Sequence, residues 1–144
     1  MDDPFDLERF VAAQDSGGTF EQALAELRRG RKTSHWIWFV FPQLAGLGRS
    51  PTAQRYAISS LDEARAYLRH PVLGPRLAEA ARTLADQPGT DAEQIFGGLD
   101  AMKVRSSMTL FHRADPEQEL FGQVLSQYFG GGEDPATDDL LRTA

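Results

Sequence analysis

The chain has 144 residues and a formal net charge of −6, and 41% of its residues are hydrophobic and 25% charged, which is typical of one soluble globular domain. No apolar run approaches the roughly 18 to 20 residues that cross a bilayer, and the acidic N-terminus lacks the basic and apolar regions of a signal peptide. With no cysteine, disulfides and thiolate metal sites are excluded. We therefore expect a cytoplasmic protein outside the membrane, and the acidic balance argues against general nucleic-acid binding.

Helical periodicity runs along most of the chain. Apolar residues recur at spacings of three and four, as in helices that bury one face. The clearest such segments are 4–15, 20–29, 61–69, 73–86 and 100–113. Ser50 and Ser60 are predicted to cap the helices that follow them, and Thr90 with Glu93 forms a capping-box pattern. We therefore predict an all-α fold, with residues 1–144 as a single compact domain of seven to nine mostly short helices.

The segment 34–41 carries a dense set of aromatic residues, including both tryptophans of the chain, Trp36 and Trp38. Its composition favours a strand. Both faces of that strand would be apolar, however, and no second strand is available to pair with its backbone groups. We therefore favour a buried helix capped by Thr33 or Ser34, with a strand as the alternative.

Acidic residues are missing from two stretches of this acidic chain. Neither 27–61 nor 101–114 contains an Asp or Glu, whereas both contain several basic residues. One explanation is a solvated basic surface. The other is that the two stretches meet in the folded protein and bind an anion.

Polar side chains accompany the aromatic segment. Lys32, His35 and Gln43 flank Trp36, and Arg49 follows in the next glycine-rich turn. In one interpretation the aromatic residues are simply core. In the other, a tryptophan forms a wall for a ring beside charged hydrogen-bond donors. His35 is either a structural histidine or an acid–base residue.

Lysine is the rare basic residue here, since only Lys32 and Lys103 occur among 15 basic residues, and each lies in an acid-free stretch. On the predicted helix 100–113, Lys103 and Ser107 share a face and Ser106 lies beside them. Such a face suits an anionic or sugar-like ligand. A polar surface stripe has the same pattern and is the alternative.

Glu8 is the carboxylate that we select for acid–base chemistry, because it lies near the apolar stripe of the first predicted helix. An exposed glutamate without a function is the alternative. We expect no metal, since the three histidines are far apart in the sequence and show no ligand-pair spacing. We also expect no cofactor, since the chain has neither a P-loop nor a dinucleotide-binding fingerprint.

Several sequence blocks carry a family resemblance. They are F-D-L-E-R-F-V-x-A-Q at 5–14, G-R-K-x-S-H-W-x-W-F-x-F-P-Q at 30–43, G-L-G-R-S at 46–50 and S-S-M-T-L-F at 106–111. With them the chain resembles an uncharacterised bacterial family of unknown function, sometimes labelled calpastatin-like, over nearly its full length. The resemblance implies an all-helical fold and gives no activity. The calpastatin label has no support in these residues, because that inhibitor is a disordered repeat protein and this chain has no repeat.

A shorter likeness concerns the first predicted helix. The order Glu8, Phe10, Ala13, Gln14 resembles the Glu-x-aromatic-x-x-Ala-Gln helix of the NADAR family, helical N-glycosidases that act on ADP-ribose or phosphoribosyl-type compounds. This resemblance implies an acid–base role for Glu8. It also implies that the segment 96–103 faces the phosphates.

We therefore predict that the protein binds a small anionic ligand, such as a nucleotide, ADP-ribose or a sugar phosphate. The expected ligand-binding residues are Lys32, Trp36, Gln43, Arg49, Lys103, Ser106 and Ser107. If the protein is an enzyme, hydrolysis of an N-glycosidic bond is the first candidate, with Glu8 or His35 in acid–base catalysis. The alternative is a non-catalytic interaction module with an aromatic core and a basic docking surface. The ligand hypothesis requires Lys32 and Lys103 to lie close together, and a pocket lined by both 31–50 and 103–109 would favour it.

Overall fold

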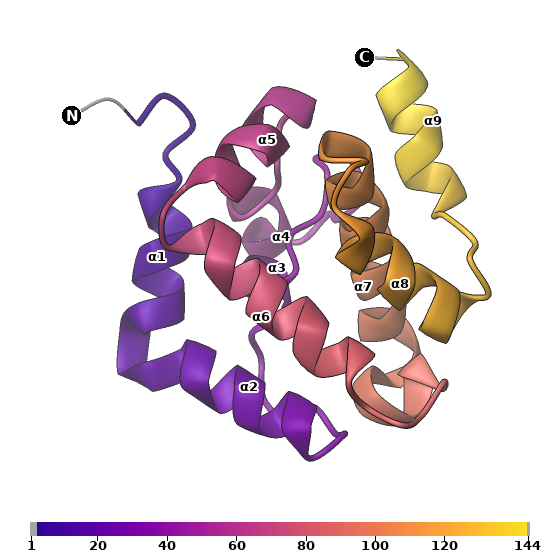
Figure 1. Cartoon of the computed structure of the whole chain (residues 1–144). Coiled ribbons are helices and arrows are strands. Elements are labelled where there is room, and N and C mark those ends of the chain that lie inside the picture. Colours follow the sequence, from indigo (N-terminus) through magenta and orange to yellow (C-terminus); the bar gives the residue numbers. More distant parts are fainter. Residues whose placement is uncertain (1–2, 144) are drawn as a thin grey trace.

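The computed structural model describes residues 3–143, which form nine α-helices and one 3-10 turn and contain no β-strand (Figure 1). In chain order these elements are α1 (Glu8–Asp15), η1 (Ser16–Gly18), α2 (Thr19–Arg28), α3 (Ile37–Val40), α4 (Pro51–Arg55), α5 (Leu61–Arg69), α6 (Leu73–Ala85), α7 (Ala92–Ala114), α8 (Glu119–Phe129) and α9 (Pro135–Thr143). The prediction of an all-α fold with seven to nine helices is confirmed.

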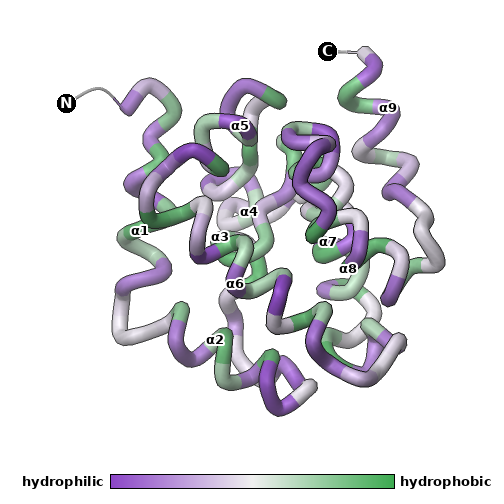
Figure 2. The backbone as a smooth tube through the Cα atoms, viewed as in Figure 1, coloured by the Kyte–Doolittle hydropathy of each residue, from purple (hydrophilic) through white to green (hydrophobic). Residues whose placement is uncertain are grey.

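Helix α6 crosses the middle of the molecule, with α1 and α2 on one side and α7 and α8 on the other (Figure 1). It packs against α2, α5 and α8, while α7 packs against α5, α8 and α9. Hydrophobic and hydrophilic residues alternate along the helices, as expected when each helix buries one face (Figure 2). None of the helices in residues 3–143 combines the length and apolar character that a membrane span requires.

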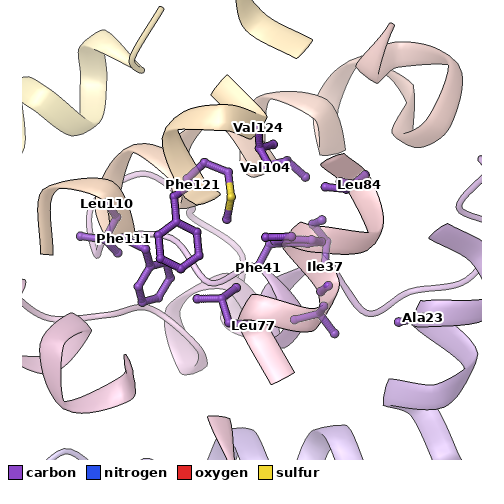
Figure 3. Packing of buried hydrophobic residues seen from close by; sticks show 14 of the residues in the cluster. Ala23, Ile37, Phe41, Leu77, Leu84, Val104, Leu110, Phe111, Phe121 and Val124 are labelled. Atoms are coloured by element: carbon purple, nitrogen blue, oxygen red, sulfur yellow. The ribbon is translucent and has the colours of Figure 1, made fainter. Parts of the chain in front are cut away.

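The core lies where α3, α6, α7 and α8 meet. Phe41, Leu77, Phe111 and Phe121 come from these four regions and gather in one interior space (Figure 3). All four are essentially inaccessible to solvent. The short α3 and the residue that follows it are therefore at the centre of the domain, which fixes the position of the loops on either side.

Local signals place several helix starts correctly. The Ser50 and Ser60 hydroxyls accept hydrogen bonds from Ala53 N–H and Glu63 N–H, so both predicted caps are confirmed. Helix α1 begins later than predicted, at Glu8, because Asp6 adopts a φ of 52° that a helix does not allow, and the Asp3 carboxylate accepts Leu7 N–H and Glu8 N–H at the helix start.

The segment 34–41 contains a helix and not a strand, but the predicted cap is wrong. Helix α3 begins at Ile37, its N-cap position is Trp36, and no side chain caps it. Thr33 and Ser34 instead donate their N–H groups to the Glu26 carboxylate. A tertiary contact therefore starts α3 where a local cap was expected.

Helix α7 joins two segments that were predicted separately. Gly97 adopts φ 77° and ψ 166° within it, so the helix breaks there and resumes at Gly98. Its cap is Asp91, whose carboxylate accepts Glu93 N–H, and the predicted Thr90 cap is wrong by one residue. The resumed run carries Lys103 and faces the loop before α3.

Candidate functional site

The loop 31–36 between α2 and α3 is held by one buried carboxylate. Glu26 Oε1 accepts Thr33 N–H at 2.7 Å, Ser34 N–H at 2.9 Å and the Trp36 indole N–H at 3.0 Å. Its Oε2 accepts the Ser34 hydroxyl and the Gln22 amide. Glu26 is inaccessible to solvent, so this carboxylate fixes the loop and places the side chains that it carries.

The same contacts determine the charge of Glu26. Burial alone would raise the pKa of this carboxyl group. The hydrogen bonds from Ser34, Thr33, Gln22 and Trp36 oppose this and hold the pKa of Glu26 well below its usual range. Glu26 is therefore an ionised, fully bonded structural anion at neutral pH, and it anchors the loop.

The two lysines of the chain converge on one carboxylate. Lys32 Nζ lies 2.7 Å from Asp100 Oδ2, and Lys103 Nζ lies 3.2 Å from Asp100 Oδ1. The side chain of Lys32 is 7% exposed, that of Asp100 19% and that of Lys103 27%, so the group is recessed rather than displayed on a surface. We call Lys32, Asp100 and Lys103 the two-lysine cluster. The requirement that both lysines lie close together is met.

Each ammonium group also lies over an indole ring. Lys32 Nζ is 5.2 Å from the ring centroid of Trp36, and Lys103 Nζ is 5.3 Å from that of Trp38. Both distances lie within the range of a cation–π interaction. The aromatic segment therefore forms one wall of the two-lysine cluster, and the start of the resumed α7 run forms the other.

The backbone favours an anion at Asp100. Gly97 leaves helical angles, and a second helical run follows it from Gly98. Asp100 lies in this first turn, where a negative charge interacts favourably with the helix dipole. The two ammonium groups and the helix start thus surround a position that already holds a carboxylate.

The two tryptophans differ in their surroundings. Trp36 is fully buried and its indole N–H is bonded to Glu26. Trp38 is half-buried, and among residues 3–143 no protein group accepts its indole N–H. Trp36 is therefore a core residue, and Trp38 is the tryptophan whose polar atom is available to a ligand. The ligand-binding tryptophan predicted from the sequence was Trp36.

Ser106 and Ser107 do not join the lysines. The Ser106 hydroxyl bonds Asp134 at 2.8 Å, and Asp134 also accepts the N–H and hydroxyl of Thr137 at the start of α9. Ser107 is inaccessible to solvent, and its hydroxyl has no partner among the described residues. Ser106 thus docks α9, and Ser107 faces the core.

The remaining predicted ligand residues lie around the aromatic segment without a shared partner. His35 is exposed next to Trp36, Gln43 is half-buried and Arg49 is exposed. The backbone oxygens of Gln43 and Arg49 accept bonds from Ile58 N–H and the Gln54 amide, which shape the turn after α3. No hydrogen bond or ion pair within residues 3–143 joins the side chains of these three residues to the two-lysine cluster.

Glu8 lies in a different environment from that expected. Its side chain is 65% exposed and bonds His70 Nε2 at 2.9 Å. His70 Nδ1 accepts the N–H groups of Val72 and Leu73, so Nε2 carries the proton that is donated to Glu8. This contact ties α1 to the start of α6. No contact in the described chain links Glu8 to either lysine.

None of five well-formed surface cavities on the described part of the chain, with volumes of about 230 to 720 Å³, is lined by a residue of the two-lysine cluster or by both 31–50 and 103–109. The largest surrounds His112 and Gly122 between α7 and α8. Among residues 3–143, no group of three or more histidine or acidic side chains is arranged to hold a metal ion.

The two residues that organise this region were missed from the sequence. Asp100 directly precedes the acid-free stretch 101–114, and Glu26 directly precedes 27–61. The predicted ligand-binding residues all lie inside these stretches, so neither Asp100 nor Glu26 was among them. The available signal was the spacing of Asp100 and Lys103, three residues apart on one helix, where opposite charges pair.

The fold and site define an all-helical domain with two lysines around an internal carboxylate. The chain belongs to the family described as "Protein of unknown function (DUF1810)", whose profile matches residues 4–141. It is 53% identical to the conserved hypothetical protein Rv1873 from Mycobacterium tuberculosis, whose crystal structure aligns with a TM-score of 0.94 over 99% of this chain and 100% of that one. The comparison with curated proteins finds no match. The expected membership of an uncharacterised all-helical family is confirmed.

Proposed function

We propose that the protein binds a small anionic ligand, such as a nucleotide, ADP-ribose or a sugar phosphate, at the two-lysine cluster. One observation carries this proposal: Lys32 and Lys103, from distant parts of the chain, direct their ammonium groups at the same carboxylate. Each ammonium has three N–H donors. Charge-assisted hydrogen bonds to carboxylate or phosphate are among the strongest that proteins make.

The surroundings supply further contacts for such a ligand. The half-buried Trp38 has an indole N–H with no acceptor among residues 3–143. His35 is exposed next to the segment, and the start of the run at Gly98 favours negative charge. Binding rather than hydrolysis is the proposed activity, because Glu8 is bonded to His70 and makes no contact with the lysines. His35 is the remaining acid–base candidate.

The test is a thermal-shift and calorimetric screen against nucleotides, ADP-ribose and sugar phosphates. A ligand present at 100 times its dissociation constant stabilises the folded state by about 2.7 kcal/mol, which is readily seen in the melting temperature. Lys103→Met, which keeps the length of the apolar stem, should abolish the shift. Arg69→Met is the matched control, because Arg69 is an exposed basic residue outside the cluster. A shift that survives Lys103→Met refutes the assignment of the site.

A second candidate, a protein-interaction module, has its own observation. Leu99 is 79% exposed and Met102 64%, and they lie on α7 on either side of Asp100 in the sequence. Exposed apolar residues beside charged ones are typical of contact surfaces between proteins. A partner isolated with the wild-type protein should then lose affinity on Leu99→Ser with Met102→Ser. A partner that binds the double variant equally well contradicts this alternative.

A further inference from the structure

Asp100 occupies the position where the anionic group of a ligand would have to bind. Its two carboxylate oxygens each take one lysine, so the region between the ammonium groups is already filled. Lys32 is less exposed than Asp100, and an external anion therefore reaches Lys32 only if Asp100 leaves. We infer that Asp100 is a displaceable internal anion, and that the ligand is a dianion of the phosphate-monoester class that replaces it. This inference depends on the proposed function.

The charges select the class of ligand. Two lysines and Asp100 carry a net charge of +1 while Asp100 is in place, and +2 once its carboxylate has moved out to solvent. A phosphate monoester carries about −1.5 to −2 charges at pH 7 and has three acceptor oxygens. It therefore matches the vacated pair of ammonium groups better than a carboxylate does. A monocarboxylate would only replace one carboxylate by another, without a gain that offsets the cost of association.

The local backbone gives Asp100 space to move. A Cβ atom added at Gly97 would meet no atom within 4 Å, and at Gly98 it would meet only Glu93 Oε1 at 3.9 Å. Both glycines are exposed. The two residues that precede Leu99 and Asp100 therefore carry no side chain that would obstruct a movement of the Asp100 carboxylate toward solvent.

Removal of the internal anion should therefore strengthen the binding of an external one. The neutral amide of Asp100→Asn does not compete with an external anion for the two ammonium groups. The affinity of this variant for inorganic phosphate should therefore be about tenfold higher than that of wild type. The variant should also melt at a lower temperature in chloride buffer, because it leaves the nearly buried Lys32 without its counter-ion. Phosphate at constant ionic strength should restore the melting temperature.

Matched variants separate this effect from general changes in charge. Asp62→Asn removes an 82% exposed carboxylate with a 3.4 Å contact to Arg65 and should leave phosphate binding unchanged. Lys32→Met combined with Asp100→Asn removes the unpaired buried charge, so it should fold readily and lose the phosphate response. In the wild type, which needs no substitution, phosphate should bind at least tenfold more tightly than acetate.

The experiment titrates all four proteins with phosphate and with acetate by isothermal calorimetry and by thermal melting, with the fluorescence of the two tryptophans as a second readout. Tighter phosphate binding by Asp100→Asn supports displacement. Equal or weaker binding by this variant overturns it, as does a wild-type protein that prefers acetate. If a screened ligand requires Lys103 and is lost in Asp100→Asn, the proposed function stands and displacement is refuted. If no screened ligand binds, but phosphate binds the wild type and binds Asp100→Asn more tightly, displacement stands and the proposed ligands are refuted. If only Asp100→Asn binds phosphate, the wild-type protein does not release Asp100 and displacement is refuted.

Discussion

Substitution of Glu26 by glutamine tests the most concentrated set of polar contacts in the protein. The amide keeps one oxygen for the three N–H donors of Thr33, Ser34 and Trp36, but it loses the negative charge. A hydrogen bond to a charged group contributes about 1.5 to 3 kcal/mol and a neutral one about 1 kcal/mol. The Ser34 hydroxyl and the Gln22 amide can reorient to accept from the new NH₂ group. We therefore expect Glu26→Gln to lower the free energy of unfolding by about 2 to 3 kcal/mol.

The pH dependence of this loss provides an internal check. Hydrogen bonding depresses the pKa of Glu26 in the folded protein below its ordinary value of 4.5. Its contribution to stability is therefore fully present above that value and is lost as the pH falls toward the depressed pKa of the folded state. The difference between wild type and Glu26→Gln should shrink between pH 7 and about pH 3.5.

The assay is equilibrium urea unfolding followed by tryptophan fluorescence, since Trp36 is bonded directly to Glu26. Glu79→Gln, at an exposed position on α6, is the control and should change the free energy of unfolding by less than about 0.5 kcal/mol. A loss for Glu26→Gln below about 0.5 kcal/mol would refute the anchoring role. So would a loss that does not change between pH 7 and pH 3.5.

Three further substitutions test other parts of the fold. Gly74→Ala should cost more than about 2 kcal/mol in an unfolding experiment, because its Cβ would come within 2.1 Å of the Leu68 carbonyl oxygen. Burial raises the pKa of Tyr67, so a spectrophotometric titration of the folded protein at pH 11 should be the same for wild type and Tyr67→Phe. Ser106→Ala should cost about 1 kcal/mol and speed hydrogen exchange in α9, because it removes the bond to Asp134.

Each of these expectations has a control and a contrary result. Gly89→Ala, where an added Cβ meets no atom within 4 Å, should be nearly neutral, and equal costs at both glycines would contradict the steric argument. For Tyr67, a loss of tyrosinate absorbance in the phenylalanine variant would show that the hydroxyl is accessible. Ser126→Ala, at an exposed position of α8, should leave exchange in α9 unchanged. Unchanged exchange in Ser106→Ala would separate Ser106 from the docking of α9.

The parts of the fold that local signals determine were predictable from the sequence. Helix α5 was predicted with both of its ends, because Ser60 caps its start and the proline after His70 ends it. Helix α3 was predicted as a helix only by excluding a strand, and its cap was wrong. The cap depends on Glu26, which precedes α3 by a loop, and no local pattern shows such a tertiary contact.

The candidate site was predictable to a similar extent. The two acid-free stretches left two alternatives, a solvated basic surface or a meeting of Lys32 and Lys103, and the structure places both lysines at Asp100. The counter-ion itself, Asp100, was missed because it lies one residue outside the stretch. Ser106 shares the helix with Lys103, but its partner Asp134 comes from the distant α9 segment. The helix and the position of Lys103 on it were predictable, whereas the surroundings of Ser106 and Ser107 depend on segments that pack against the helix and were not.

The two converging lysines have a consequence for the resistance of the folded protein to proteolysis. Lys32 belongs to the first third of the chain and Asp100 to the last third, so the cluster exists only when both portions have docked. An anion bound there would stabilise the docked state and not its separated parts. Proteases that cleave transiently opened chains report the population of that open state. Resistance to digestion should therefore rise with the concentration of the ligand. The bound anion would hold the segment that carries Lys32 against the segment that carries Asp100 and Lys103.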